Sequence, residues 1–334
     1  MTHKLLIIGN ITLALSMLVS CYNAKTESSE TEKEPSAQFH GGPKIGQPMM
    51  GGLDRPTPSP ELQALIDETV PHFKQAVFID EKNDTLQYNL FSPQNIKEGE
   101  KYPIVLFMAD ASTPGPNVLT PLTQGYGGLV WAAPEFQKEH PCFVLVPQYS
   151  YVTVDNEWQT MPEVDQTISL LKSIVANNPI DSDRIYTTGQ SMGGMMSLYF
   201  NIKYPDLFAA SLFVSCQWDV EKMNEFKNKK FIYITAGGDH TATGGADQLK
   251  ALLKKENAAF ETTSWSARLP EVEQDSLAAK LLAKPCDRYF ITFEGDTDLP
   301  ESITNPGPGM VHMASFNFAY KLKPVTEWLL QQHK

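Results

Sequence analysis

Short, continuously apolar segments that alternate with helical segments constrain this fold more than any other feature of the sequence. A strand exposed on one face would alternate apolar and polar residues, so strands that lack this alternation must be buried on both faces. The longer segments between them carry apolar residues at helical spacing. This order predicts one α/β domain with a mostly parallel central sheet and helices on both faces. The expected strands are 103–108, 142–147, 184–188, 211–215, 230–235 and 287–293, and the expected helices are 163–177, 192–204, 246–256 and 276–282.

The segment before this alternation has a different pattern. Residues 61–75 have helical spacing and follow Ser59 and Pro60, a combination that favours the start of a helix. Residues 76–80 and 85–91 flank an Asn-Asp pair, which predicts an antiparallel hairpin at the N-terminal side of the sheet. We therefore expect a single folded domain over residues 61–334.

A glycine-rich turn joins one expected strand to one expected helix. Residues 189–193 read G-Q-S-M-G, directly after strand 184–188 and at the start of helix 192–204. In this context G-x-S-x-G is typical of a sharp, strained turn that holds a serine hydroxyl clear of the sheet. Larger side chains at both ends of the motif would collide, and Gly194 would let the helix approach a neighbouring strand. The bare pattern is common, but its context predicts that Ser191 is a nucleophile.

A serine hydroxyl is a weak nucleophile, so it needs a general base and a carboxylate that orients the base. In this arrangement the acid and then the histidine are expected in later loops that follow strands. Asp239 follows the expected strand 230–235, and His312 lies in a long loop before the last helical segment. We predict a catalytic triad of Ser191, Asp239 and His312. The alternatives are that Asp239 only supports a turn and that His312 is a surface loop residue.

The reaction of such a triad produces a negatively charged oxygen that backbone N–H groups must stabilise. The N–H of Met192, the residue after the expected nucleophile, is one candidate donor to this oxyanion. The second is expected from the loop after strand 103–108, where Ala109 or Asp110 could supply it. The carboxylate of Asp110 would oppose this role unless it points away or accepts a hydrogen bond.

Four further residues are candidates for contacts with the substrate. Gln190 precedes the expected nucleophile, and His240 follows the expected acid. Trp218 and Tyr126 are expected in loops after strands, where an aromatic ring can stack on a sugar or an aromatic acyl group. Residues 125–128 are glycine-rich but lack the strand and helix of a dinucleotide site. We expect no metal and no cofactor.

The N-terminal residues have the pattern of an exported protein. Lys4 precedes an apolar stretch over residues 5–19, and a Leu-Val-Ser-Cys sequence that resembles a bacterial lipoprotein processing site ends at Cys21. Residues 1–21 are therefore expected to be a lipoprotein signal peptide, with an ordinary secretory signal as the alternative. Residues 22–60 are expected to be a flexible acidic, proline- and glycine-containing tether. Lipidation at Cys21 would anchor the protein to the bacterial cell envelope, on its periplasmic or cell-surface face.

Charge and cysteine content restrict the partners. The 334-residue chain has a formal net charge of −12, so it lacks the basic surface that binds nucleic acid. We expect contact with the membrane through the lipid anchor only. Three cysteines remain besides the expected lipidation site, and in an oxidising compartment one disulfide among them is possible. They are Cys142, Cys216 and Cys286.

With these residues in view, the chain resembles the α/β-hydrolase superfamily. The resemblance is strongest to the secreted branch of polyhydroxybutyrate-depolymerase-like, feruloyl-esterase-like and "predicted peptidase" proteins, and it implies the α/β-hydrolase fold. The family usually has His-Gly where this chain has Ala109 and Asp110, which is a departure at the expected oxyanion hole. Besides the serine motif, the resemblance rests on KYPIVLF at 101–107, HPCFVLVPQ at 140–148, IDSDRIY at 180–186, YPDLFAA at 204–210 and HMASF at 312–316.

These observations predict a serine hydrolase that cleaves carboxylic esters through an acyl-enzyme. The resemblance and the expected envelope location suggest a small-molecule or oligosaccharide substrate, such as acylated carbohydrate or plant-derived esters. A serine peptidase with the same triad is the main alternative. A binding lipoprotein that retains the fold without activity is a third, which the presence of all three triad positions disfavours.

Overall fold

The computed structural model describes residues 44–47, 57–304 and 306–334, all within one compact unit. The predicted signal peptide over residues 1–21, the lipidation site Cys21 and most of the predicted tether over residues 22–60 lie outside the described residues. Among the residues that the structure describes, no helix is both long enough and apolar enough to span a bilayer.

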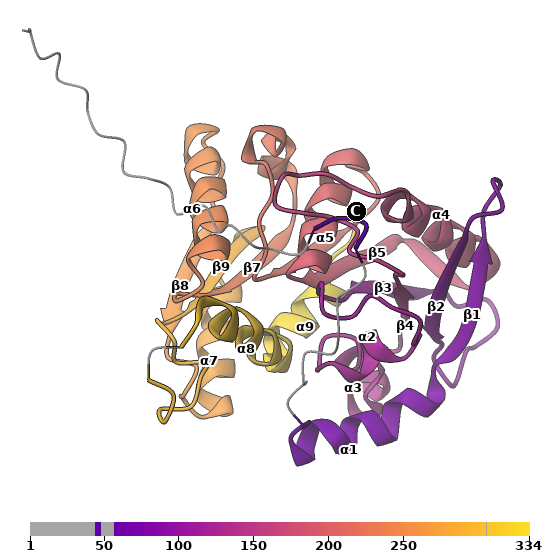
Figure 1. Cartoon of the computed structure of the whole chain (residues 1–334), viewed down its shortest axis with the longest axis horizontal. Coiled ribbons are helices and arrows are strands. Elements are labelled where there is room, and N and C mark those ends of the chain that lie inside the picture. The colour runs from indigo at the N-terminus through magenta and orange to yellow at the C-terminus, as the bar shows by residue number, and fades with distance from the viewer. Residues whose placement is uncertain (1–43, 48–56, 305) are drawn as a thin grey trace, which may run out of the picture. The chain divides into compact units, whose positions relative to one another are not determined.

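The described residues form nine strands of a single sheet. They are β1 (Lys74–Ile79), β2 (Thr85–Phe91), β3 (Tyr102–Met108), β4 (Phe143–Gln148), β5 (Ile180–Gln190), β6 (Ala210–Val214), β7 (Phe231–Ala236), β8 (Glu261–Trp265) and β9 (Arg288–Phe293). Their order is β1-β2-β4-β3-β5-β6-β7-β9-β8 (Figure 1). The pairs β1·β2 and β2·β4 are antiparallel, and all the others are parallel. The predicted sheet and its N-terminal hairpin are confirmed.

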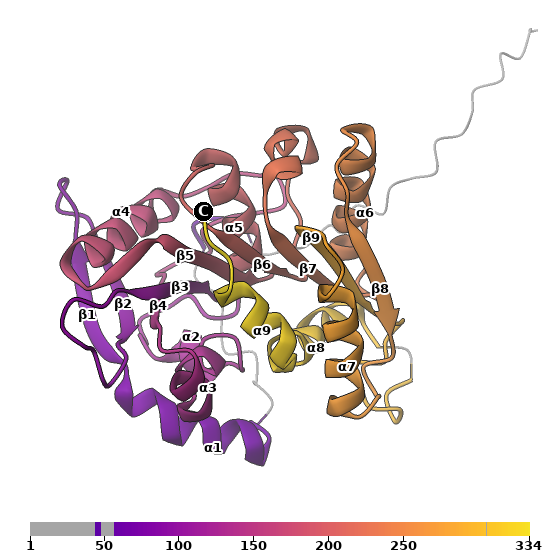
Figure 2. The ribbon, with the colours of Figure 1, turned by 180° about the vertical axis from the view of Figure 1, so that it is seen from behind.

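Helices cover both faces of this sheet. They are α1 (Pro60–Thr69), α2 (Thr120–Thr123), α3 (Pro134–Glu139), α4 (Pro162–Asn177), α5 (Met192–Lys203), α6 (His240–Lys255), α7 (Glu271–Leu282), α8 (Pro308–Lys321) and α9 (Lys323–Leu330). Helices α4, α5 and α6 lie on one face, and the other helices lie on the opposite face (Figures 1 and 2). The layers are those that the sequence predicted.

The central strands explain why their sequences do not alternate. Along β3, Ile104 and Leu106 pack against α4 and α5, whereas Val105 and Phe107 pack in the core on the other face. All four side chains are fully buried. Each strand therefore places every second side chain in a different core, and both cores require apolar residues.

Several element boundaries differ from the predicted ones. Helix α1 ends at Thr69 and a short 3₁₀ turn over Val70–His72 follows, because Pro71 has no N–H to continue the helical hydrogen bonds. Helix α6 begins at His240 rather than at residue 246, because the Asp239 side chain caps its first turn. Strand β8 was not predicted because its sequence, Glu-Thr-Thr-Ser-Trp, is polar and lies at the edge of the sheet.

A short part of the predicted tether contacts the domain. The N–H of Gly46 donates to the carbonyl oxygen of Val152 at 2.9 Å, and the N–H of Val152 donates to the carbonyl oxygen of Gln47 at 3.2 Å. Residues 44–47 thus pair with the loop that follows β4, although the sequence predicted a free tether throughout.

Candidate active site

The turn after β5 has the strained geometry expected of a serine held out for chemistry. Ser191 has a φ of 50° and a ψ of −119°, which is unfavourable for a residue with a side chain. A Cβ atom at Gly189 would overlap the backbone of Gly193, and a Cβ atom at Gly193 would overlap the carbonyl group of Met108 at the end of β3. The glycines at both ends of the motif are therefore required by close backbone contacts, as the sequence predicted.

Two further contacts fix this turn between its neighbours. The N–H of Ser191 donates to the carbonyl oxygen of Val214 at 3.0 Å, which ties the turn to the end of β6. A Cβ atom at Gly194 would lie 2.7 Å from the Cys216 side chain, so only glycine lets α5 approach the residues after β6. Residues 189–194, called the elbow below, are thus held from both sides.

The structure brings the three predicted triad residues together. The Nε2 atom of His312 lies 2.8 Å from the Oγ atom of Ser191, and the Nδ1 atom of His312 lies 2.6 Å from the Oδ2 atom of Asp239. A carboxylate can only accept, so Nδ1 carries the hydrogen and Nε2 accepts from the serine hydroxyl. This is the arrangement in which an imidazole can take a proton from a serine.

Asp239 has a separate role for each carboxylate oxygen. While Oδ2 faces His312, Oδ1 accepts a hydrogen bond from the N–H of Ala242 at 3.2 Å and so caps α6. The side chain is buried, and the first turn of α6 faces it. A negative charge at a helix N-terminus interacts favourably with the helix dipole.

His312 lies within α8, so the prediction that it belongs to a loop is wrong. The sequence Gly-Pro-Gly at residues 307–309 suggested a loop, but a proline is compatible with the first turn of a helix because no hydrogen bond is lost there. The preceding residue, Val311, packs against Ala236 and Leu299. The rings of His312 and Phe316 pack edge-on with their centroids 5.1 Å apart, and the His312 side chain is 27% exposed.

The sheet topology accounts for the location of the site. Strand β3 pairs with β4 on one side and with β5 on the other. The chain therefore adds β4 to one side of β3 and then crosses over to add β5 on the other side, which makes a topological switch point between β3 and β5. Ligands of open α/β sheets bind at the carboxyl ends of the strands beside such a reversal. Ser191, Asp239 and the loop after β3 all follow strand ends at this edge.

A buried hydrogen bond joins the loop after β3 to the end of β5, and the sequence did not predict it. The Oδ2 atom of Asp110 accepts a hydrogen bond from Nε2 of Gln190 at 3.0 Å, and its Oδ1 atom accepts one from the N–H of Ser112 at 2.7 Å. Both Asp110 and Gln190 are buried. The Asp110 carboxylate is therefore engaged, and Gln190 supports this loop instead of making the expected contact with substrate.

The predicted oxyanion donors lie where the elbow meets this loop. The close approach of Gly193 to Met108 and Ala109 places the end of β3 against the first turn of α5. The first N–H groups of a helix have no partner within the helix, and Met192 is the first residue of α5. The donor roles of Met192 and of Ala109 or Asp110 remain predictions.

The other predicted substrate contacts differ in their placement. The ring of Trp218 is buried between Trp158 and Tyr199, with both ring centroids 5.6 Å away. Tyr126 is also buried, with the Lys321 ammonium 5.5 Å from its ring centroid. The expectation of exposed aromatic faces is therefore wrong, because distant segments cover both rings. His240 is exposed in the first turn of α6, beside Asp239.

A buried carboxyl group near the triad was not singled out from the sequence. Asp298, between β9 and α8, is buried, and within the described chain neither oxygen has a hydrogen-bond partner beyond its own backbone N–H. Burial, assisted by the negative charges of Asp296 and Asp239, raises the pKa of Asp298 to about 7, although its backbone N–H and Arg268 act in the opposite direction. Only its spacing from Asp296 in an acidic loop could have drawn attention to it.

The cysteines are free and two of them are inert. Cys142, Cys216 and Cys286 form no disulfide, so the bond that the sequence allowed is not made. Burial raises the pKa of the Cys142 thiol to about 12 and that of the Cys216 thiol beyond it. A thiol with such a pKa is not a nucleophile at neutral pH.

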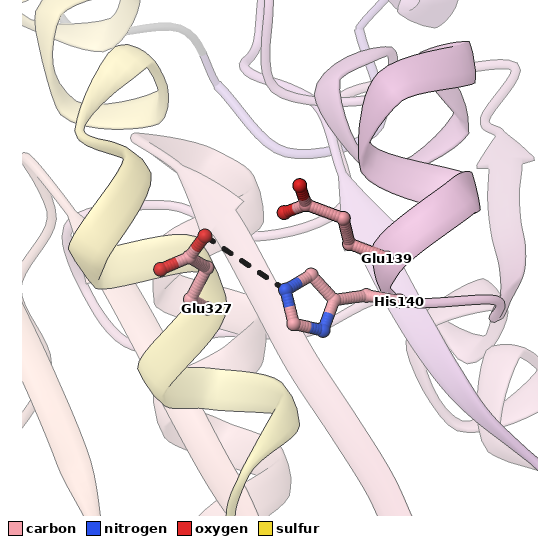
Figure 3. A group of neighbouring side chains, drawn as sticks. All are labelled: Glu139, His140 and Glu327. Atoms are coloured by element: carbon pink, nitrogen blue, oxygen red, sulfur yellow. Dashed lines mark ion pairs between the residues drawn. The ribbon is translucent and has the colours of Figure 1, made fainter.

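One cluster in the described chain has side chains of the types that bind metals. Glu139 at the end of α3, the adjacent His140 and Glu327 on α9 place their ligand atoms within 4.8 Å of one another (Figure 3). The Nζ atom of Lys323 lies 3.5 Å from both carboxylates. This ammonium group already pairs with both acids, so the cluster is explained as a surface ion-pair network.

Comparison with known sequences gives one family match over part of the chain. A sequence model of the prolyl oligopeptidase family matches residues 152–259, about a third of the chain, which include Ser191 and Asp239 but not His312. No curated protein sequence matches significantly. Fold and site together therefore define the class: a serine-hydrolase site on an α/β-hydrolase fold.

Two solved structures are similar to this fold. A thermostable esterase aligns with a TM-score of 0.63 and 22% identity, over 80% of this chain and 64% of the esterase chain. An S-formylglutathione hydrolase from Staphylococcus aureus aligns with a TM-score of 0.50 and 11% identity, over 77% of this chain and 98% of that chain. The chain thus spans less than two thirds of the esterase, and both likenesses establish the fold.

Proposed function

We propose that this protein is a serine hydrolase that cleaves carboxylic esters through an acyl-enzyme. The observation that carries the proposal is the hydrogen-bonded series from Asp239 through His312 to Ser191, with distances of 2.6 and 2.8 Å. The strained backbone of Ser191 supports it, because such strain is retained where a function requires it.

The geometry defines the steps. The Ser191 hydroxyl attacks the ester carbonyl carbon while Nε2 of His312 takes its proton, and Asp239 stabilises the resulting imidazolium. The N–H of Met192 and one from the loop after β3 would stabilise the oxyanion. His312 then gives the proton to the departing alcohol, and the acyl group stays on Ser191. Water, deprotonated by His312, attacks this second ester, and His312 gives that proton to Oγ of Ser191 as the acid is released.

Acylated carbohydrates and plant-derived esters are the proposed substrates. The His312 side chain is 27% exposed and Ser191 is partly exposed, so both residues reach the protein surface. An acyl group carried on a large molecule could therefore reach them. The sequence resemblance to feruloyl-esterase-like proteins supports the same substrate class.

A serine peptidase is the second candidate, favoured by the match to the prolyl oligopeptidase family model over residues 152–259. The same triad can release an amine instead of an alcohol. A parallel assay with para-nitrophenyl acetate and aminoacyl-naphthylamides separates the two, and acetylated and feruloylated oligosaccharides then define the ester. We expect turnover of the esters and little turnover of the amides, and the reverse result would favour the peptidase.

The Ser191→Ala variant is the control for both candidates and for a non-catalytic binding protein. We expect it to fold with an unchanged circular dichroism spectrum and to lose ester turnover by at least about 10³-fold. A wild-type protein without turnover of any ester or amide would favour the binding protein. Full activity in Ser191→Ala would reject the proposed nucleophile.

We propose further that Cys21 is lipidated and anchors the protein to the bacterial envelope. The support is the sequence before this cysteine and the acidic, proline-containing segment that follows it. In cells that express the full chain, Cys21→Ala should move the protein from the membrane fraction to the soluble fraction and abolish palmitate labelling. Unchanged membrane association and labelling in this variant would contradict the anchor.

A further inference from the structure

Two serine hydroxyls lie beside the triad without a role in the steps above. Ser215 directly follows β6, and Ser315 lies on α8, one turn after His312. Both side chains are fully buried, and their Oγ atoms are 2.6 Å apart. Ser215 has a φ of 41°, a left-handed conformation that costs a residue with a side chain about 1–3 kcal/mol. A strained residue in a buried contact beside a catalytic site suggests a functional role.

The direction of these hydrogen bonds follows from the number of protons. The Oγ–H group of Ser315 donates to the carbonyl oxygen of His312 at 2.8 Å. A serine hydroxyl has one hydrogen, so toward Ser215 it can only accept. Ser215 therefore donates to Ser315, which donates to His312. These two bonds join the end of β6 to the helical turn that carries the histidine.

The same end of β6 also holds the nucleophile. Val214 accepts a hydrogen bond from the N–H of Ser191 at 3.0 Å, and the N–H of Ser215 donates to the carbonyl oxygen of Ile234 on β7 at 2.8 Å. Two adjacent residues of one strand end thus contact the backbone of the nucleophile and, through Ser315, the backbone of the base.

We propose that Ser215 and Ser315 are positioning residues that set the distance between Oγ of Ser191 and Nε2 of His312. Apolar side chains such as Val311 and Phe316 also hold α8, but apolar contact is not directional. The hydroxyls of Tyr320 and Thr188, 2.9 Å apart, tie the last turns of α8 to β5, whereas the serine pair acts on the turn that carries His312. A displacement of about 1 Å in an active site can lower the rate by about 100-fold. The inference rests on the proposed function, because it assumes that His312 is the base for Ser191.

The first test compares the kinetics of Ser215→Ala, Ser315→Ala and the double variant with a para-nitrophenyl ester. We expect each single variant to lower kcat by about 10–100-fold with KM within about twofold, because the loss affects the step in which the proton moves. The double variant should be no slower than the slower single variant, since the two hydroxyls act as one unit.

The matched control is Ser211→Ala, which removes another fully buried hydroxyl of β6. Ser211 exchanges hydrogen bonds of 2.9 and 3.2 Å with the side chain of Asn201 on α5 and has none with α8. It should lower the midpoint temperature of unfolding about as much as the test variants while kcat stays within about twofold. An equal loss of kcat in Ser211→Ala would show that the test variants lose activity because the protein is destabilised, and it would overturn the proposal.

A second measurement does not depend on turnover. The hydrogen bond from Nδ1 of His312 to Asp239 should give a low-field proton resonance in the NMR spectrum, which the Asp239→Asn variant assigns by its loss. We expect this resonance to broaden in Ser215→Ala and Ser315→Ala but not in Ser211→Ala. Unchanged resonance and unchanged kcat in both test variants would overturn the positioning role. Ester turnover that survives Ser191→Ala would instead reject the proposed function, while the resonance still shows whether the pair orders His312.

Discussion

The elbow and the segment that carries the histidine are held in place by different kinds of contact. In the elbow, Gly189 and Gly193 touch backbone atoms so closely that no side chain fits. The second segment, residues 294–316 and called the histidine arm below, depends on side-chain hydrogen bonds such as that between the hydroxyls of Ser215 and Ser315. Steric exclusion is all or none, whereas one hydrogen bond contributes about 0.5–1.5 kcal/mol. The glycines of the elbow should therefore tolerate no substitution, whereas loss of single contacts in the arm should lower activity in steps.

The largest effect is expected at Asp239, which orients the histidine of the arm toward the serine of the elbow. Asp239→Asn keeps an oxygen for the Ala242 N–H but turns an amide N–H toward Nδ1 of His312. The imidazole must then present Nε2–H to Ser191 and can no longer accept its proton. We expect kcat to fall by about 10³–10⁴-fold with little change in stability. Kinetics and thermal unfolding of the same sample check this, and a loss below tenfold would exclude Asp239 as the orienting acid.

The next effect tests the elbow. In Gly193→Ala the new methyl group would overlap the Met108 carbonyl group, which is backbone and cannot move aside. We expect a loss of stability of more than about 3 kcal/mol, measured by urea unfolding, or no soluble protein. The matched control is Gly244→Ala in α6, where a Cβ atom would have no neighbour within 4 Å. It should stabilise the protein by about 0.5–1 kcal/mol. Similar stabilities of the two variants would contradict the steric account.

The same difference explains how much of the site could be predicted from sequence. Ser191 and its glycines were predictable because the G-x-S-x-G pattern lies in one short segment between a strand and a helix, although the contacts that require Gly193 and Gly194 come from the distant residues Met108 and Cys216. Asp239 and His312 could be assigned from the order of strands and candidate side chains. The helix around His312 could not, because Val311 is buried by residues from two other segments, Ala236 and Leu299. Such burial leaves no local signature in the sequence.

The fold follows the same rule. The buried parallel strands were predictable because two covered faces demand an apolar sequence. The edge strand β8 was not, since an edge strand with one exposed face tolerates threonine and serine. Trp218 and Gln190 looked accessible in the sequence, but their burial arises from contacts with other loops: Trp218 packs against Trp158, and Gln190 bonds to Asp110.

A smaller effect is expected at Asp298 in the histidine arm. Its pKa of about 7 lies above the ordinary value because of burial, so the folded protein holds a proton that the unfolded chain releases. The free energy of unfolding must then fall as the pH rises through about 4 to 7, by at most about 4 kcal/mol. Asp298→Asn should therefore stabilise the protein by about 1–3 kcal/mol at pH 8 and by less at pH 5.

Urea unfolding at both pH values measures this difference. The control is Asp296→Asn, which removes an exposed carboxylate two residues away and should change stability by less than about 0.5 kcal/mol. An Asp298→Asn variant with the same stability gain at both pH values would show that burial of the charge is not the cause. A confirmed effect would show that a natural residue of the histidine arm lowers the stability of the protein at neutral pH, whereas the glycines of the elbow are required for it.

The smallest effect is expected at Arg268, which holds the middle of the histidine arm. Its Nε and Nη2 atoms donate to the carbonyl oxygen of Leu299 at 3.4 and 3.1 Å. Arg268→Met keeps the apolar part of the side chain and removes both bonds, so we expect a loss of stability of about 1 kcal/mol and a change in kcat below about threefold. The measurements are urea unfolding and ester turnover.

The control for this variant lies on the central strand β5, in the half of the strand that is remote from the elbow. Arg184 bonds in a similar way, with Nη2 donating to the carbonyl oxygen of Lys101 at 3.1 Å and Nε to Asp181 at 2.8 Å. Arg184→Met should lower stability by a similar amount and leave kcat unchanged. If Arg268→Met instead lowered kcat by more than tenfold, single contacts of the arm would be as indispensable as the glycines of the elbow. The position of His312 would then depend on one contact and not on the sum of several.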